Sequence, residues 1–385
     1  MAQHAASFYK DHFDAAPDVV ASAPGRIEFI GNHTDYNGGL VIGGAIDRRT
    51  TVAVGRRSDG AVHLVSDRFD SHVLVIEANE IESPRDDWTR YPIAVLRAIS
   101  TTRPVGGLDI AVCSNLDVGA GLSSSAALEM ATAQAVSAMW ELSMDTAGLV
   151  AASHRAETEF VGVPCGLLDQ TVVGYGRSDR LVMLDASDNS HRLLPIDRAT
   201  KVFLLVTHET HALSNSLYGV RRGECGEALQ LLARPIPGLS RLTELHPFDL
   251  AAYGGLLPDN LLRRARHVVE ENERVRRAAS STDPAEIGRL LFASHASSRD
   301  LFENSTDALD FIVACLEKTP GIIGGRLTGG GFGGAALAWT DSSVTDKDLE
   351  HIVRAYDERF SRRLEVLSVN WSDGVRIDSG PGPRA

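Results

Sequence analysis

Residues 115–127 have the composition of a loop that binds an anion. They read NLDVGAGLSSSAA and run into an Ala-rich stretch with helical character that continues to residue 142. Gly119 and Gly121 permit backbone conformations that a Cβ atom would forbid, so successive N–H groups can point at one ligand. Three serines follow where the first helical turn should begin, and their hydroxyls add to N–H groups that lack a partner within the helix. The segment therefore predicts a cradle for an anion such as phosphate.

A Gly-rich turn that merely begins a helix is the alternative for this segment, and two further segments argue against it. Residues 25–39 read GRIEFIGNHTDYNGG, and residues 327–339 read LTGGGFGGAALAW. Three separated stretches that are dense in glycine and polar groups indicate one composite site.

The first of these segments places hydrogen-bonding side chains in a turn between two apolar stretches. Arg26, Glu28 and Ile30 would share one face of a strand, because side chains alternate along it. Residues 32–35 then fall in the turn. Arg, Asn, His and Asp together supply donors and acceptors suited to sugar hydroxyls. A solvated loop is the alternative.

Asp169 is a carboxylate in otherwise apolar, Gly-bounded surroundings, within VPCGLLDQTVVGYG at residues 163–176. Such a carboxylate commonly caps a helix or accepts a structural hydrogen bond. The other motifs favour a chemical role for it instead.

Two common nucleotide-binding patterns are excluded. None of the lysines occurs in a GxxxxGK[ST] pattern, so the chain has no Walker loop. Gly329, Gly331 and Gly334 match GxGxxG, but that fingerprint must open a helix, whereas this one opens onto the strand-like sequence AALAW. The Rossmann interpretation is therefore rejected.

Length and composition bound the class of protein. A chain of 385 residues is expected to form two domains. The polar connection at residues 187–198 is the expected boundary, which gives domains 1–196 and 197–385. The net charge of −13 makes nucleic acid or an anionic membrane a poor partner.

The expected location is the cytoplasm. No apolar run reaches the roughly 18 residues of a membrane span, and the first residues are polar and mixed in charge, so neither a span nor a signal peptide is expected. The four cysteines lack CxxC spacing, which argues against a zinc site or a disulfide framework.

Alternating and helical patterns predict the elements that position these motifs. In the first domain we expect helices at 4–13, 88–99, 123–142 and 145–161, and strands at 19–22, 27–30, 40–46, 50–56, 62–66, 107–114 and 181–185. In the second we expect helices at 217–232, 260–280, 284–299, 308–318 and 346–360, and strands at 201–206, 325–328, 335–339 and 366–370. A loose tail is expected from residue 379.

The three glycine-rich segments resemble the three motifs of the GHMP small-molecule kinases, and the first resembles the galactokinase signature. AETEFVGVPCGLLDQ at 156–170, THETHALSNSLYGVRRGEC at 207–225 and RRARHVVEENERV at 263–275 also resemble galactokinases. The chain is identified as a member of the galactokinase branch. This resemblance implies an α/β plus α+β fold: an N-terminal domain of the ribosomal-protein-S5 type, a C-terminal ferredoxin-like domain, and a site between them.

The same resemblance implies a kinase that uses ATP and Mg²⁺ to phosphorylate the C1 hydroxyl of galactose or a close galacto-configured sugar. Asp169 would accept the hydroxyl proton, while Arg26 would pair with it and stabilise the transferring phosphoryl group. Ser125 and Glu157 would hold Mg²⁺. The implied sugar contacts are Asn32, His33, Asp35, Gly166 and Tyr218. The implied phosphate-binding residues are Gly119, Ala120, Gly121, Leu122, Ser123, Ser124 and Ser125.

Three positions depart from the galactokinase pattern. Asn32 replaces the Glu of GEHTDY that hydrogen-bonds the C6 hydroxyl in the family, Glu28 stands where the family usually has Asn, and Asp117 replaces a customary Pro. Exchanging Glu for Asn removes a negative charge and supplies two N–H donors. Two substrates therefore stay open: galactose, with the Asn32 amide oxygen accepting O6–H, or galacturonate or another modified sugar.

Functions from other classes are also considered. A non-catalytic sugar- and ATP-sensing regulator could share this scaffold, but the presence of Arg26, Ser125, Glu157 and Asp169 favours an active kinase. A mevalonate or homoserine kinase would have no reason to carry the HTDYNGG and PCGLLDQ segments. By family analogy, we expect a monomer or a weak homodimer.

Overall fold

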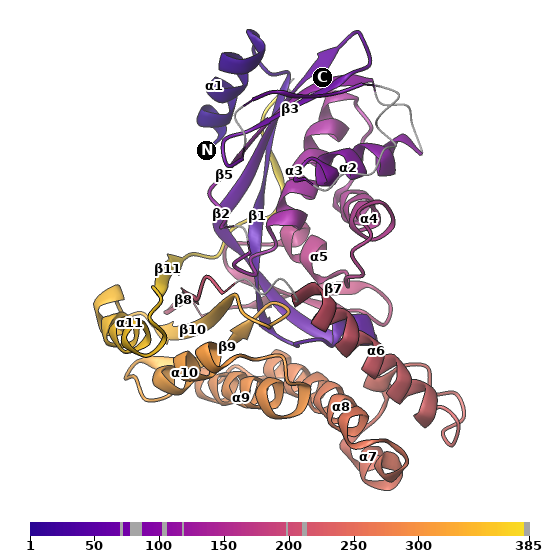
Figure 1. Ribbon diagram of the computed structural model, residues 1–385, viewed down its shortest axis with the longest axis vertical. Helices are drawn as coiled ribbons and strands as arrows, with labels where there is room; N and C mark the ends of the chain where they lie inside the picture. Colours follow the sequence, from indigo (N-terminus) through magenta and orange to yellow (C-terminus); the bar gives the residue numbers. More distant parts are fainter. Residues whose placement is uncertain are drawn as a thin grey trace.

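Two β-sheets and their helices make up the computed structural model of the chain (Figure 1). The structure describes residues 1–69, 72–77, 87–101, 106–117, 119–197, 199–209 and 214–380. The first sheet has eight strands in the order β12-β1-β2-β5-β3-β4, with β6 pairing with β2 and β7 with β6. The second has four antiparallel strands in the order β11-β8-β10-β9.

The first sheet is built on two long antiparallel strands, β1 and β2. They lie side by side along the long axis of the molecule, with β1 running toward the second sheet and β2 away from it (Figure 1). The first half of β2 pairs with β6 and the second half with β5, so one strand joins two parts of the sheet. The strands are β1 Val19–Ile30, β2 Leu40–Arg57, β3 Val62–Ser66, β4 Leu74–Ile76, β5 Gly107–Ser114, β6 Arg180–Asp185, β7 Ser190–Pro195 and β12 Arg376–Ser379.

The prediction that residues 19–30 and 40–56 form four short strands is wrong. Pro24 and Gly25 lie within the strand. The register of β1 against β2 shifts between Pro24 and Arg26, and this irregularity accommodates both residues without ending the strand. Every residue of β1 is buried. The face that carries Arg26 and Glu28 therefore belongs to a rigid central strand.

Helices cover both faces of the first sheet. Residues of β1 alternate between them, since Val19 and Ala21 pack in the core under α2, α3 and α4, whereas Val20 packs against Ala5 and Tyr9 of α1. The helices are α1 Ala2–Phe13, α2 Arg90–Ser100, α3 Ser124–Met139, α4 Thr146–Arg155 with a following π-helical turn Ala156–Val161, and α5 Leu168–Tyr175.

The second sheet is also covered on two faces. Phe203 and Leu205 of β8 pack against α10 and α11, whereas Val202 and Leu204 face a second core that includes Ile27 of β1 and Leu291 of α9. The strands are β8 Thr200–Val206, β9 Ile322–Thr328, β10 Ala335–Asp341 and β11 Glu365–Val369. The helices are α6 Ser214–Leu232, α7 Pro247–Tyr253, α8 Asp259–Ser280, α9 Pro284–Ser297, α10 Asp307–Leu316 and α11 Asp346–Phe360.

Several elements differ from the expectation. The polar stretch expected to connect the domains contains β7, which forms a hairpin with β6 and is mostly exposed, so it lacks the alternation of a half-buried strand. The short helices α5 and α7 were not predicted. The expected tail begins inside β12, and residues 381–385 lie outside the described part of the chain.

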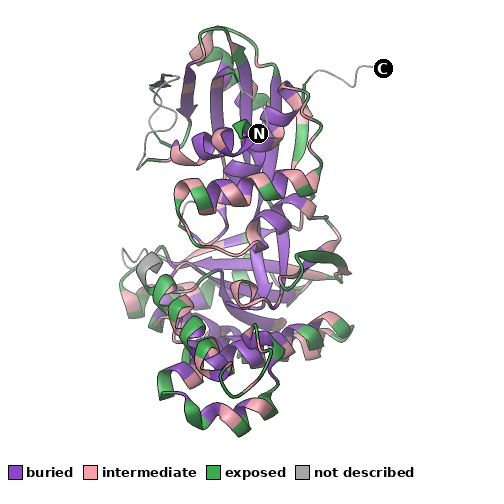
Figure 2. Ribbon diagram, turned by 90° about the vertical axis from the view of Figure 1, so that its right-hand side faces the viewer, coloured by how far each residue is buried: buried purple, intermediate pink, exposed green. Residues whose placement is uncertain are grey.

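The strand β12 pairs with β1, so the chain returns to the first sheet after completing the second. The division at residue 196 stays a prediction. Figure 2 shows buried strands in both sheets, with exposed residues on the outer sides of the helices. Within the described residues, no helix combines the length and the apolar character needed to cross a bilayer.

Candidate active site

A cavity of about 450 Å³ brings together side chains from distant parts of the chain. Its volume is in the range of small-molecule sites. It contains all seven residues predicted for catalysis and sugar binding, together with the predicted metal ligand Glu157. The lining residues are Arg26, Glu28, Asn32, His33, Asp35, Glu157, Gly162, Val163, Pro164, Cys165, Gly166, Leu168, Asp169, Tyr218, Gly330, Gly331 and Phe332.

Arg26 and Asp169 form an ion pair at this cavity. The Arg26 Nε and Asp169 Oδ1 atoms are 2.8 Å apart, and a terminal nitrogen of Arg26 lies at the same distance from Oδ1. Asp169 sits in the first turn of α5, where the helix dipole favours a negative charge. Its side chain is 26% exposed against 8% for Arg26, so the carboxylate is the more accessible partner.

The glycine-serine loop lies directly against this pair. Gly119 and Gly121 have φ values of 84° and 74°, which favour glycine, as expected. The Gly121 carbonyl accepts a hydrogen bond of 2.6 Å from Arg26 Nη1, and the Leu122 carbonyl accepts one of 3.1 Å from the Arg26 backbone N–H. Arg26 therefore ties the loop to β1 and to Asp169.

The side chain of the first serine, Ser123, does not cap α3. Ser123 precedes α3 in a left-handed conformation, with φ of 55°, and its side chain makes no cap hydrogen bond. Its hydroxyl donates to Asp169 Oδ2 instead. The first N–H groups of α3 thus have no serine cap from Ser123, and remain oriented for an anion.

Ser125 and Glu157, the predicted metal ligands, are in contact. The Ser125 hydroxyl donates to Glu157 Oε1 at 3.1 Å, and Gln170 Nε2 donates to Glu157 Oε2 at 2.6 Å. Burial raises the pKa of Glu157, and the charge of Asp169 adds to the effect. Glu129 lies behind, and one of its buried oxygens has no hydrogen-bond partner in the described chain. Neither Gln170 nor Glu129 was predicted as a site residue. Gln170 lies in the PCGLLDQ segment, where Asp169 was the candidate, and Glu129 lies in the Ala-rich helical stretch.

His33 and Tyr218 form an aromatic wall of the cavity. Their ring centroids are 5.0 Å apart. His33 Nε2 donates to the Gly330 carbonyl at 3.0 Å, while Nδ1 accepts from the Tyr36 hydroxyl at 2.8 Å. Burial lowers the pKa of His33 to about 3, so the ring stays neutral. Burial raises the pKa of Tyr218, which keeps its hydroxyl protonated as a donor.

Asp35 and Gly166 are packed against each other. A Cβ atom on Gly166 would lie 1.8 Å from Asp35 Oδ2, so only glycine fits beside this carboxylate. Burial raises the pKa of Asp35 to about 7, and the charge of Glu28 contributes. Asp35 therefore changes charge near neutral pH.

This titration predicts a pH dependence of sugar use. As the pH falls through about 7, Asp35 gains a proton and becomes a weaker acceptor for sugar hydroxyls, so kcat/KM for the sugar should fall about tenfold per pH unit. The check is kcat/KM between pH 5.5 and 9 for the natural protein and Asp35→Asn. In Asp35→Asn the fall of kcat/KM near pH 7 should disappear. If the same fall remained in the variant, another group would be responsible for it.

A second, smaller cavity of about 110 Å³ lies on another side of the serine loop. Ser124 and Ser125 line it together with the aromatic rings of Phe69, Trp88 and Tyr91. The Phe69 and Trp88 rings are stacked, 5.8 Å apart and 7° from parallel. These aromatic residues belong to no recognised motif, so this cavity was not predicted.

Residues 90–177 match the GHMP kinases N terminal domain and residues 275–360 the GHMP kinases C terminal family model. The fold and site thus define a GHMP small-molecule kinase, which confirms the predicted fold class. Residues 7–56 match the galactokinase galactose-binding signature.

Full-length relatives show the family. The chain is 36% identical to a galactokinase of Roseiflexus sp. (strain RS-1) over 372 residues, 95% of each chain, and 38% identical to a galactokinase of Thermotoga neapolitana over 359 residues, 92% of this chain and 98% of the relative. A crystal structure of Lactococcus lactis galactokinase complexed with galactose superposes with a TM-score of 0.92 at 28% identity, covering 97% of this chain and 99% of the other. The chain belongs to the galactokinase family. It is therefore an ATP-dependent sugar 1-kinase.

Proposed function

We propose that this kinase transfers the γ-phosphoryl group of ATP to the C1 hydroxyl of galactose. The observation that carries the proposal is the position of the Arg26–Asp169 pair, which joins the glycine-serine loop to the cavity lined by Asn32, His33 and Asp35. The similar Lactococcus lactis enzyme is described as complexed with galactose.

The residues of the pair divide the chemistry. The hydroxyl oxygen forms a bond to the γ-phosphorus of ATP while the bond from that phosphorus to the β,γ-bridging oxygen breaks, and ADP leaves. Asp169 accepts the hydroxyl proton through its Oδ2 atom, which in this structure accepts a hydrogen bond from the Ser123 hydroxyl. Arg26 orients Asp169 and offsets the negative charge that builds on the transferring group.

We place the nucleotide along the serine loop. Its phosphates would meet the N–H groups of residues 119–125, since Gly119 and Gly121 have left-handed φ values there. The base would enter the second cavity and stack on its aromatic rings. Ser124 and Ser125 line the second cavity, and the same loop contacts the Arg26–Asp169 pair of the first cavity through Gly121 and Ser123, so one ATP molecule could reach both.

Ser125 and Glu157 fit a magnesium ion. Hydroxyl and carboxylate oxygens are ligands that Mg²⁺ accepts, and a cation would offset the crowded charges of Glu157, Glu129 and Asp169. When bound, Mg²⁺ would neutralise phosphate charge. The four cysteines are free, as in a reducing cytoplasm, and we propose a monomer or weak homodimer there.

Glu157→Gln should therefore raise the Mg²⁺ concentration needed for half-maximal activity by roughly 10- to 100-fold. The measurement is a Mg²⁺ titration at saturating ATP and galactose, with calorimetry of Mg-ADP binding as a second readout. The exposed residue Glu159, two positions further on, gives the matched control Glu159→Gln. An equal Mg²⁺ requirement in both variants would refute the assignment.

The assay that tests the function is ADP release with Mg-ATP in the presence of galactose, galacturonate, N-acetylgalactosamine, glucose or arabinose. Galactose should give the highest kcat/KM, and the product should be a sugar 1-phosphate by NMR. A higher kcat/KM for galacturonate than for galactose would show that the substrate is a uronic acid. Sugar and ATP binding without ADP release would indicate the sensing regulator.

A further inference from the structure

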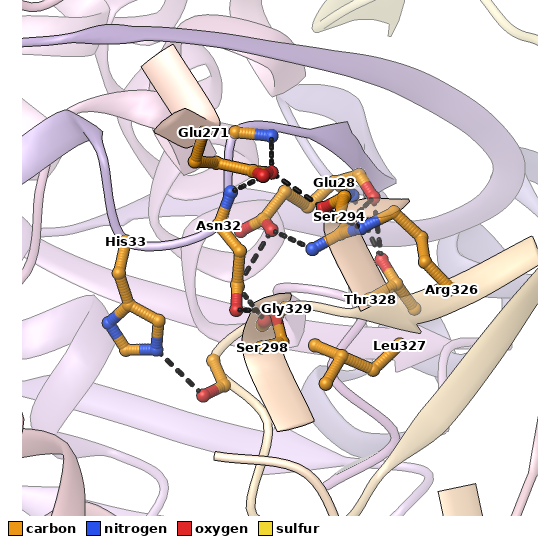
Figure 3. A network of polar contacts seen from close by, with 12 residues as sticks. Glu28, Asn32, His33, Glu271, Ser294, Ser298, Arg326, Leu327, Thr328 and Gly329 are labelled. Carbon is orange, nitrogen blue, oxygen red and sulfur yellow. Dashed lines mark hydrogen bonds and ion pairs between the residues drawn. The ribbon is translucent and has the colours of Figure 1, made fainter. Parts of the chain in front are cut away.

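The amide of Asn32 has no capacity left for a ligand. Its nitrogen donates to Glu28 Oε1 at 2.9 Å and to the Gly329 carbonyl at 2.8 Å (Figure 3). Its oxygen accepts from Ser298 at 3.1 Å and from Asn304 at 2.7 Å. A primary amide has two donors and two lone pairs, and all are used. Asn32 is also fully buried.

The orientation of this amide is fixed by its partners. A backbone carbonyl can only accept hydrogen bonds, so the Asn32 atom that lies 2.8 Å from the Gly329 carbonyl oxygen must be nitrogen. Both explanations that the sequence left open for Asn32, as acceptor of a sugar hydroxyl or as host for a sugar carboxylate, would require breaking this network.

The carboxylate of Glu28, unlike the amide of Asn32, still has a hydrogen-bonding atom available. Its Oε1 atom holds Asn32 Nδ2 and, at 3.2 Å, a guanidinium nitrogen of the fully buried Arg326. Its Oε2 atom has no hydrogen-bond partner in the described chain. This oxygen is also not among the unpaired side-chain atoms of the described residues that are completely buried. Since Glu28 lines the cavity and is 6% exposed, this oxygen is available to a ligand there.

The surrounding network holds Glu28 in place. Arg326 also donates to the Glu28 backbone carbonyl at 3.1 Å, and Thr328 donates to the same carbonyl. The adjoining turn is fixed from α8, because Glu271 Oε1 accepts the backbone N–H groups of Gly31 and Asn32 (Figure 3). The Glu28 carboxylate is therefore held by a rigid strand, with Oε1 hydrogen-bonded and Oε2 free to bind a ligand.

We propose that Glu28 is the specificity-determining acid of the sugar site: its free oxygen accepts a hydroxyl of a neutral sugar and disfavours an anionic one, while Asn32 is a positioning residue that holds it. This inference rests on the proposed function. Compared with the galactokinase pattern, the acid and the amide at positions 28 and 32 have exchanged places. The site therefore keeps one acid and one amide, but the acid now lies on β1.

The charges around the cavity support selection for a neutral sugar. Four carboxylates line it, namely Glu28, Asp35, Glu157 and Asp169, whereas the one cation among its lining residues, Arg26, is paired with Asp169. Arg326 is committed to Glu28 and is fully buried. A sugar carboxylate would thus lack a free cation and meet excess negative charge.

The test compares galactose with galacturonate, which differ by one carboxylate. Dissociation constants are measured by calorimetry, and kcat/KM by ADP release, at pH 8 for the natural protein, Glu28→Gln and Glu159→Gln. Glu159→Gln is the control, because it makes the same Glu-to-Gln change at an exposed carboxylate that does not line the cavity. Ratios between sugars do not depend on the fraction of each variant that folds.

The natural protein should bind galactose at least about 100-fold more tightly than galacturonate. Glu28→Gln should reduce that ratio roughly 10- to 100-fold, and Glu159→Gln should leave it within about threefold. An unchanged ratio in Glu28→Gln, or equal or tighter galacturonate binding by the natural protein, would overturn the inference. Absence of ADP release with galactose would refute the proposed function, while the binding ratios would still decide the role of Glu28.

Discussion

Asp169→Asn should lower kcat about 10²- to 10³-fold while the protein keeps its fold. The amide is nearly isosteric, so α5 and the cavity should keep their shape, but it cannot take the proton of the sugar hydroxyl. It also offers Arg26 a weaker partner than the carboxylate that now lies 2.8 Å from Arg26 Nε. The main effect is expected on kcat, because the proton moves only as the phosphoryl group transfers.

Steady-state kinetics and thermal unfolding of Asp169→Asn check this prediction, with Asp11→Asn as the matched control. Asp11 is exposed on α1 and does not line the cavity, so its variant should behave like the natural protein. If Asp169→Asn kept more than about a tenth of the natural kcat, Asp169 would orient the hydroxyl without accepting its proton.

The sequence predicted the chemical groups of the site better than their contacts. Arg26, Asp169 and the glycine-serine loop stand out because glycine and charged residues are concentrated in short segments. All three meet at one ion pair. By contrast, the partners of Asn32 come from Ser298 and Asn304, 266 and 272 positions away, and only the fold shows that they use up its amide.

The elements were predictable where burial leaves a pattern in the sequence. The continuous apolar runs of β8 and β10, which are buried on both faces, and the periodicity of helices such as α11 Asp346–Phe360 gave bounds close to the observed ones. The hairpin strand β7 lacks such a pattern because it is exposed on both sides. In β1, Pro24 and Gly25 look like a break, yet pairing with β2 carries the strand past them.

Arg26→Lys should lower kcat by roughly 10²- to 10³-fold although the positive charge is kept. The guanidinium contacts two groups at once: Asp169 through Nε and a terminal nitrogen, and the Gly121 carbonyl through Nη1 at 2.6 Å. An ammonium group is a point charge that cannot reproduce this forked geometry. The variant should therefore loosen the glycine-serine loop and raise KM for ATP as well.

Combining Arg26→Lys with Asp169→Asn tests whether the two residues act as one unit. If Arg26 works mainly by holding Asp169, the double variant should lose little more activity than the worse single variant, since the second change removes a contact that is already impaired. If the two losses multiply instead, Arg26 stabilises the transferring phosphoryl group independently of Asp169. The KM for ATP reports a third effect, the loss of the contact between Arg26 and the glycine-serine loop. Of the two residues, Arg26 is the one that contacts the Gly121 carbonyl, so Asp169→Asn alone should leave the KM for ATP within about threefold of the natural value.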